Sequence, residues 1–310
     1  MSLMRTFFLA VSQSESLRQI AIGLGPIRKM SRRFTAGETL EDAIAAVEKL
    51  NRKGLLATLD HLGENVTSET EARDATTSVL DLLEAIEASG VRSGVSVKLT
   101  QLGLDLSPAL AAENLQRILV QAASAQRFVR IDMESSEYVQ RTLDLFAGLW
   151  PQHRNVGVVI QSYLRRSADD VARLVRQGAS VRLVKGAYDE PPEIAFAEKA
   201  ETDASFMQIV DQLFSDEAQA NGVFPAIATH DTRLIEQTKI LALRRGVGQD
   251  HFEFQMLYGI RPRLQRQLVA EGYRVRVYVP YGQQWFPYLM RRLAERPANV
   301  SFLLRNLLRP

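Results

Sequence analysis

The 310-residue chain contains no cysteine. This absence excludes disulfide bonds, thiolate metal sites and cysteine nucleophiles, and it leaves the cellular compartment open. Histidine is also scarce. The four histidines show no HExxH or other paired-ligand spacing, and they are His61, His153, His230 and His251. We therefore expect no metal site.

The sequence also lacks long apolar runs and an excess of charge of one sign. No stretch approaches the ~18 apolar residues of a membrane span, and the N-terminal segment MSLMRTFFLAVSQSES turns polar too soon for a signal peptide. The 38 basic and 36 acidic residues give a net charge of +2, so nothing in the charge balance calls for a nucleic-acid partner. We expect a cytoplasmic protein that does not bind nucleic acid. Nothing in the sequence indicates an oligomeric state.

What the sequence does contain is a repeated alternation of strand-like and helix-like segments. Eight short runs rich in Val, Ile, Leu or Phe each end in a polar side chain and are separated by helix-length stretches. The strands are predicted at 55–59, 94–99, 128–132, 156–161, 179–184, 224–228, 251–255 and 274–279. This alternation predicts an α/β fold, a (β/α)8 TIM-type barrel whose active site lies at the C-terminal ends of the strands.

The first 50 residues precede the first predicted strand. We expect residues 1–50 to form an N-terminal helical extension that covers the outside or the bottom of the barrel, and residues 51–310 to form the barrel itself. The helix after the first strand shows the capping-box spacing of Ser68 and Glu71 and a C-terminal Gly90. The segment GLGPIRK at 23–29 follows a helix and lacks the third glycine of a dinucleotide-binding motif, so it predicts a turn.

Polar side chains gather at the C-terminal tips of the predicted strands, where a barrel would bring them together. They are Asp60, Lys98, Asp132, Glu134, Gln161, Arg182, Lys185, Thr229, His230, Asp231, Gln255 and Tyr278. As a group they indicate an active site. Taken alone, the carboxylates of Asp60, Glu134 and Asp231 could instead cap the helices that follow them.

Lys98 stands among apolar neighbours on a strand that should be buried on both faces. Its ammonium group must therefore find a partner or lose its proton. Three roles remain open from the residues alone. Lys98 could be a Schiff-base nucleophile, it could pair with Asp132 on the next strand as part of the active site, or it could form a purely structural ion pair.

The segment after the eighth strand predicts a helix with a charged stripe. Pro287 suits the first turn, and Tyr288, Arg291, Arg292 and Glu295 fall three or four residues apart. Two neighbouring guanidinium groups held by a glutamate form a fork for a carboxylate or a phosphate. A solvated basic helix face is the alternative.

RLVKGAY at the fifth strand combines two cations with a glycine. Arg182 and Lys185 lie just before Gly186, where the lack of a side chain allows a ligand to approach the backbone closely. Two cations beside such a backbone suit the pyrophosphate of a nucleotide cofactor.

These segments together resemble the proline dehydrogenase family. The resemblance extends from about residue 55 to 305, and it rests on SVKL, RIDME, VVIQSY, RLVKGAY, ATHD, FEFQMLYG, VYVPYG and YLMRRLAE in this order. The most specific part is YxxRRxxE after the eighth strand combined with RLVKGAY after the fifth. The resemblance implies oxidation of L-proline to Δ1-pyrroline-5-carboxylate by a non-covalently held FAD, with electrons passed to a membrane quinone. Contact with the membrane would then be peripheral, at the inner face of the cytoplasmic membrane.

The resemblance also implies roles for individual residues. Arg291 and Arg292 would hold the proline carboxylate, with Lys98 and its partner Asp132 nearby. The apolar pocket would be shaped by Tyr278, Tyr288, Leu257 and Ala187, and Tyr278 would favour proline over hydroxyproline. The flavin would be held by Gln161, Arg182, Val184, Lys185, Gly186, Ala187, Thr202, Thr229 and His230, with Asp132 and Glu295 beside it; Glu295 would orient the two arginines. A barrel lyase or aldolase that uses Lys98 as a Schiff base is the alternative from the residues themselves.

Overall fold

The computed structural model describes residues 31–295, and in them eight parallel strands form a closed barrel. Each strand pairs with its neighbour in sequence, and β1 closes the barrel by pairing with β8. The strands are β1 (Leu56–His61), β2 (Ser93–Val97), β3 (Val129–Ile131), β4 (Val156–Gln161), β5 (Ser180–Val184), β6 (Pro225–Ala228), β7 (Glu253–Leu257) and β8 (Arg274–Tyr281). The predicted (β/α)8 barrel is confirmed.

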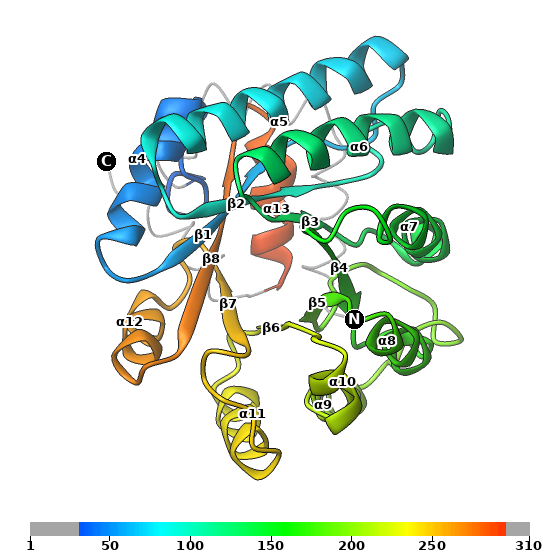
Figure 1. Ribbon diagram of the computed structural model, residues 1–310, viewed down its shortest axis with the longest axis vertical. Coiled ribbons are helices and arrows are strands. Elements are labelled where there is room, and N and C mark those ends of the chain that lie inside the picture. The colour runs from blue at the N-terminus through cyan, green and yellow to red at the C-terminus, as the bar shows by residue number, and fades with distance from the viewer. Residues whose placement is uncertain (1–30, 296–310) are drawn as a thin grey trace.

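Helices surround the barrel in a ring (Figure 1). They are α4 (Leu40–Asn51), α5 (Glu69–Ser89), α6 (Pro108–Ser124), α7 (Ser136–Leu149), α8 (Ser167–Arg176), α9 (Lys199–Leu213), α10 (Asp216–Ala220), α11 (Thr232–Arg244) and α12 (Pro262–Ala270). Helix α4 packs on β1 and β8, as expected for a helix that precedes the first strand and covers the outside of the barrel. Residues 1–30 of the predicted helical extension, with the predicted turn at 23–29, lie outside the described residues, and the domain division at residue 50 stays a prediction.

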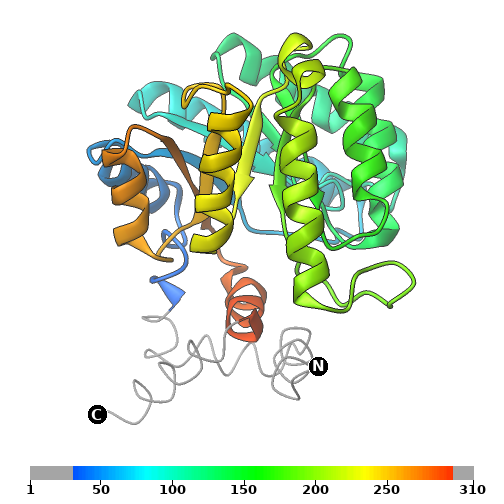
Figure 2. The ribbon, with the colours of Figure 1, turned by 90° about the horizontal axis from the view of Figure 1, so that it is seen from below.

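The last described helix, α13 (Trp285–Glu295), does not join this ring. Figure 2 shows α13 standing below the barrel, on the side toward which the strands run, and Figure 1 shows it through the middle of the ring. Helix α4 therefore fills the place on the outer wall between β8 and β1, while α13 lies across the C-terminal end of the barrel.

Helix α5 begins and ends at the predicted residues. The Ser68 side chain accepts a hydrogen bond from the Glu71 backbone N–H at 3.2 Å, and Gly90 follows the helix with a left-handed φ of 67°. The Glu71 carboxylate accepts a hydrogen bond from the Thr67 N–H at 2.7 Å. The predicted capping box is thus extended by one residue, because Thr67 also presents its N–H to this carboxylate.

Apolar and charged residues alternate along the strands and divide the core into two parts. In β3, Val129 and Ile131 are fully buried against the helices, whereas Arg130 bonds across the inside of the barrel to Ser180. Burial of a Val, Leu or Ile side chain contributes about 1.5–3 kcal/mol, so the apolar layer between strands and helices supplies the main stabilisation. The interior of the barrel carries charge.

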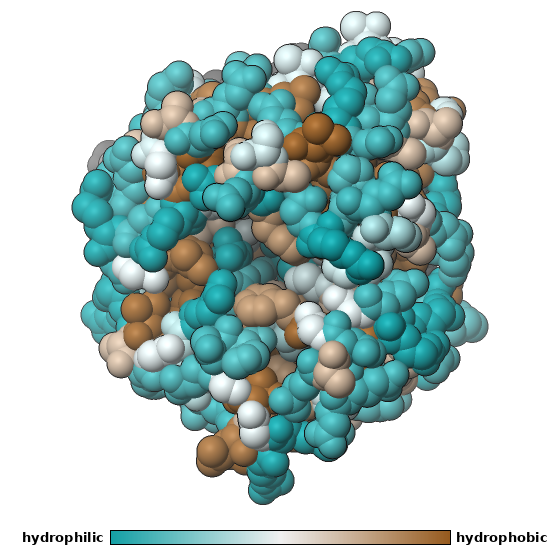
Figure 3. Space-filling view, in the orientation of Figure 1, coloured by the Kyte–Doolittle hydropathy of each residue, from teal (hydrophilic) through white to brown (hydrophobic). Residues whose placement is uncertain are grey.

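The end of the barrel at which the strands begin is mostly hydrophilic. In the space-filling view of Figure 3, hydrophobic residues on this face form separate patches rather than one continuous surface. The side chains that the sequence singled out lie at the opposite end.

Candidate active site

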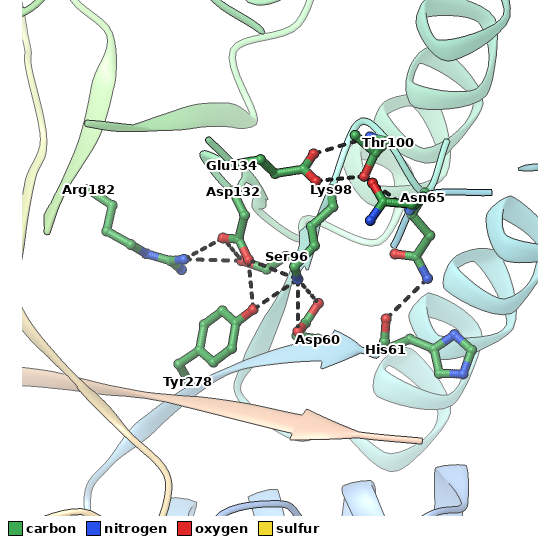
Figure 4. Close-up of polar contacts among 11 residues, drawn as sticks. Asp60, His61, Asn65, Ser96, Lys98, Thr100, Asp132, Glu134, Arg182 and Tyr278 are labelled. Carbon is green, nitrogen blue, oxygen red and sulfur yellow. Dashed lines mark hydrogen bonds and ion pairs between the residues drawn. The ribbon is translucent and has the colours of Figure 1, made fainter. Parts of the chain in front are cut away.

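Lys98 is the centre of a buried charge cluster at the C-terminal ends of β1, β2 and β3 (Figure 4). Its Nζ lies 3.1 Å from each carboxylate oxygen of Asp60 and 3.5 Å from Oδ2 of Asp132. The predicted pair with Asp132 is present, but Asp60 is the closer partner. Asp60 does not cap α5, whose N-cap is Ser68. The signal for this role was available, since β1 is the other neighbour of β2 and also ends in a carboxylate.

The two carboxylates keep Lys98 charged. Burial lowers the pKa of Lys98, but the attraction of Asp60 and Asp132 outweighs burial, so the pKa lies well above its ordinary value. A Schiff-base lysine must present a neutral amine. The site therefore favours an electrostatic role for Lys98 over a nucleophilic one.

The Asp132 carboxylate accepts hydrogen bonds from four side chains, which come from β2, β5 and β8 or from the residue directly after β2. It accepts from Ser96 Oγ at 3.0 Å, from Arg182 Nη1 at 2.8 Å and from the Tyr278 hydroxyl at 2.6 Å, in addition to Lys98. Burial raises the pKa of Asp132, but Lys98 and Arg182 outweigh it, so the pKa is lowered. Burial and then Asp132 hold the pKa of Tyr278 well above its usual value. Asp132 is thus ionised and Tyr278 protonated.

A second charged layer lies deeper in the barrel. Arg276 Nε lies 2.7 Å from Glu253 Oε1, and Arg130 Nη1 donates to the Ser180 carbonyl at 2.8 Å. Gln255 donates to the same Glu253 oxygen at 2.5 Å, so its amide turns down into this layer and not toward the mouth. The expected convergence of all strand-tip groups is wrong for Gln255, because its inward side chain meets a carboxylate two residues earlier on the same strand.

Lys185 anchors a second ion-pair network on the opposite side of the mouth. Its Nζ lies 2.6 Å from Asp203 Oδ1 and 3.2 Å from Asp231 Oδ2, and Arg233 also pairs with Asp203 at 2.5 Å. Asp231 caps α11 as well, by accepting from the Arg233 N–H at 3.1 Å. Burial raises the pKa of Asp231, but the hydrogen bond from Lys185 and its charge outweigh burial and lower the pKa to about 2. Asp203 lies on helix α9 and has no strand-tip position that could have revealed it.

Several other predicted flavin residues lie beside this network. Thr229 Oγ1 accepts from the Asp231 N–H at 3.1 Å, and His230 Nε2 accepts from the Leu257 N–H at 3.0 Å. The Thr202 hydroxyl donates to the Glu198 carbonyl at 3.4 Å. Gly186 has a φ of 109° and packs so closely on the Tyr163 ring that a Cβ atom would overlap it.

Two buried polar atoms at the mouth fit a flavin nucleotide. Gln161 donates from Nε2 to the Glu134 carbonyl at 3.2 Å, while its Oε1 is buried without a hydrogen-bond partner among the described residues. The Nε atom of Arg182 is likewise buried without a hydrogen-bond partner among the described residues. Buried polar groups of proteins are nearly always paired, and an acceptor and a donor in these places match the polar edge of an isoalloxazine ring. Lys185 adds a cation for a pyrophosphate.

Helix α13 brings its charged stripe to this end of the barrel. Tyr288 is buried, and the Arg292 guanidinium carbon lies 5.1 Å from the centroid of the Tyr288 ring. The side chains of Arg291 and Glu295 lie outside the described residues, so the predicted arginine fork stays a prediction. Val184, Ala187 and Leu257 lie at the ends of β5 and β7, on the same side of the barrel.

Neither a metal cluster nor a membrane span appears in the part of the chain that the structure describes. In residues 31–295, no three His, Cys, Asp or Glu side chains gather in a way that could hold a metal ion. Within the same range, every helix is too short or too polar to cross a membrane.

Comparisons with known proteins agree with this geometry. The family model described as proline dehydrogenase matches residues 43–305. Proline dehydrogenase 1 of Bacillus subtilis (strain 168) is 43% identical over 308 residues, covering 99% of this chain and 100% of that protein. Proline dehydrogenase of Deinococcus radiodurans is 40% identical over 312 residues, covering 99% of this chain and 98% of that protein.

A solved structure shares the fold. The crystal structure of proline utilization A from Bdellovibrio bacteriovorus, inactivated by N-propargylglycine, superposes with a TM-score of 0.84 at 27% identity. The match covers 97% of this chain and 37% of that larger chain.

Proposed function

The chain belongs to the proline dehydrogenase family, and on this premise we propose that it oxidises L-proline to Δ1-pyrroline-5-carboxylate with non-covalently bound FAD and passes the electrons to a membrane quinone. The protein would work in the cytoplasm and touch the inner face of the cytoplasmic membrane only peripherally.

The observation that carries this proposal is the balance of charge around Lys98. Lys98 and Arg182 contribute two positive charges, and Asp60 and Asp132 contribute two negative charges, within one set of buried contacts. The cluster is therefore neutral by itself and fixes Lys98 in place. The net positive charge that a substrate carboxylate needs would come from Arg291 and Arg292 on α13, which crosses this end of the barrel.

The remaining residues enclose the substrate and hold the cofactor. Tyr278 keeps its proton and donates to Asp132, and the Arg182 guanidinium carbon lies 5.3 Å from the centroid of the Tyr278 ring. These contacts fix the ring, which would form one wall of the substrate pocket. Tyr288, Ala187 and Leu257 would complete this pocket, and Tyr278 would favour proline over hydroxyproline. Fixing both partners in an enclosed site can lower a barrier by about 7 kcal/mol or more.

The chemistry that bound FAD would supply at this site is that of a hydride acceptor for the substrate carbon. Gln161 and Arg182 would meet the isoalloxazine ring with the two unpaired polar atoms described above, and Asp132 and Glu295 would lie beside it. The rest of the nucleotide would be held by Val184, Lys185, Gly186, Ala187, Thr202, Thr229 and His230. The secondary amine must be neutral when hydride leaves, and a buried site disfavours its charged form.

An absorption spectrum tests the proposal directly. The purified protein is expected to show flavin absorption that bleaches when L-proline is added without oxygen and returns when a soluble quinone is supplied. A colourless protein that forms a borohydride-stable substrate adduct on Lys98 would overturn the proposal in favour of a Schiff-base lyase.

Substitution of the α13 arginines tests the substrate site separately. Arg292→Ala and Arg291→Ala should each raise the KM for proline by about tenfold or more, while the FAD content of the purified protein changes little. Unchanged proline kinetics in both variants would contradict the carboxylate role.

A further inference from the structure

Helix α7 is capped from a distant part of the chain. Its N-cap residue, Ser135, makes no side-chain capping bond. Instead, the Glu190 carboxylate accepts from the Ser136 backbone N–H at 2.7 Å and from the Ser136 hydroxyl at 2.5 Å. Glu190 lies 54 residues further along the chain, in the loop between β5 and α9.

This contact is well placed to stabilise both segments. A carboxylate at a helix N-terminus pairs with otherwise unsatisfied N–H groups and with the positive end of the helix dipole. Hydrogen bonds to a charged acceptor are about twice as strong as neutral ones. Both bonds are partly buried, so water competes with them less than at an open surface.

The loop that Glu190 fastens carries residues of the proposed flavin site. The β5–α9 loop, residues 185–198, begins with Lys185, Gly186 and Ala187, and Figure 2 shows it at the same end of the barrel as α13. Its second half has its own anchor on the loop after β4. The Arg165 N–H donates to the Ile194 carbonyl at 3.0 Å, and its side chain donates to the Pro192 carbonyl at 3.0 Å. Glu190 anchors the first half, five residues after Lys185.

The other end of the contact also leads to the site. Helix α7 begins two residues after Glu134, whose carbonyl orients the Gln161 amide, and four residues after Asp132. Glu190 therefore connects the β3–α7 loop to the β5–α9 loop, and both loops carry residues of the proposed site at the mouth of the barrel.

We propose that Glu190 is a positioning residue that caps α7, holds the β5–α9 loop closed along the rim of the barrel and thereby slows release of the flavin nucleotide. This inference rests on the proposed function. It adds a residue without direct contact to the reacting groups and predicts a kinetic effect on cofactor retention.

Amide hydrogen exchange and flavin release test the proposal together. Glu190→Ala should accelerate exchange of the amides at 186–190 and at the start of α7 by about tenfold, since a helix cap of this kind is typically worth such a factor. The FAD dissociation rate of the holoenzyme, measured by transfer to an excess of a flavin-binding trap, should rise by a similar factor. Ser136→Ala removes only one of the two bonds and should give about a third of that increase.

Two further variants serve as a control for the charge of the loop and as a conservative substitution of Glu190. Glu193→Gln changes the charge of an exposed glutamate in the same loop and should leave exchange and FAD release as in the wild type. Glu190→Gln keeps the shape of the side chain and one acceptor oxygen, and it should show an intermediate acceleration even if Glu190→Ala fails to fold.

The outcomes separate this inference from the proposed function. Wild-type protein that takes up no FAD would refute the proposed function. Wild-type protein that holds FAD, with Glu190 variants that release it at the wild-type rate, would refute the inference alone and reduce Glu190 to a helix cap.

Discussion

Replacing Asp60 by asparagine isolates the charge that holds Lys98. The Asp60 side chain is only 1% exposed, and both of its oxygens lie 3.1 Å from Lys98 Nζ. Asparagine keeps the size and shape of the side chain but removes the negative charge. Of Asp60 and Asp132, only Asp132 then still carries a charge beside Lys98, at 3.5 Å. Asp132 already accepts hydrogen bonds from Arg182 and Tyr278.

The distances set the size of the effect. Two unit charges 3.1 Å apart attract by about 5 kcal/mol at an effective dielectric constant of ~20. Part of this is offset because asparagine costs less to bury than a carboxylate. Breaking one side of a buried ion pair typically costs about 3–5 kcal/mol, and the remaining bond to Asp132 places Asp60→Asn at the low end. We expect the free energy of unfolding to fall by about 3 kcal/mol.

The pH dependence gives a second, independent signature. The pKa of Lys98 is raised in the folded protein, so its contribution to stability is complete below the ordinary lysine pKa of about 10.4 and is lost as the pH rises through the folded-state pKa. Without Asp60 the folded-state pKa falls. The alkaline loss of stability, and of kcat/KM for proline, should therefore begin at lower pH in Asp60→Asn.

Urea denaturation and steady-state kinetics across the alkaline range measure both effects. Asp74→Asn is the matched control, because Asp74 is an exposed aspartate on α5, and it should change the unfolding free energy by no more than about 0.5 kcal/mol. If Asp60→Asn matched this control in stability and kept the wild-type pH profile, the reasoning about Lys98 would be refuted.

Two further predictions concern packing and acid stability. Gly157→Ala should lower the free energy of unfolding by about 1–3 kcal/mol, because the added Cβ would lie 2.6 Å from the Ser180 carbonyl oxygen. In Gly148→Ala, within α7, the added Cβ meets nothing within 4 Å, so this variant should raise the free energy of unfolding by about 0.5–1 kcal/mol. Thermal or urea unfolding measures both. The pKa of Asp231 is depressed to about 2 beside Lys185, so its contribution is present above the unfolded-state pKa of about 3.9 and fades as the pH falls through about 2. The deficit of Asp231→Asn in urea unfolding should thus be constant near pH 7 and shrink between pH 4 and 2; a deficit that persists at pH 2 would contradict the ion pair with Lys185.

The strands and their order could be predicted because parallel strands buried on both faces read as short apolar runs. The predicted 156–161 is β4 itself, and the other ranges differ from the observed strands by one or two residues at their ends. The polar residue that closes each run marks the C-terminal end, where the barrel gathers side chains.

Contacts across the barrel were harder to predict, because they depend on register. Val97 pairs with Ile131, so Lys98 and Asp132 are neighbours in register and the sequence favoured that pair. On the other side, Asp60 pairs with Ser96, two residues before Lys98. The sequence indicated that β1 also ends in a carboxylate, but the stagger of the strands was needed to show that the long lysine side chain reaches back to Asp60. Asp203 and Glu190 lie on a helix and in a loop, and no sequence pattern pointed to either.

The charged interior of the barrel is better explained by function than by stability. Buried ion pairs often contribute no more than apolar residues of the same volume would, because desolvation offsets their attraction. The apolar layer between strands and helices, with residues such as Val129 and Ile131 fully buried, already holds the fold. Inside, Lys98, Arg182 and Arg276 are each paired with a carboxylate, and Asp132 accepts hydrogen bonds from four side chains. Such an arrangement keeps Lys98 charged and holds Lys98 and Arg182 in place before any ligand arrives, and preorganised charge of this kind stabilises a transition state without reorganisation at the moment of reaction.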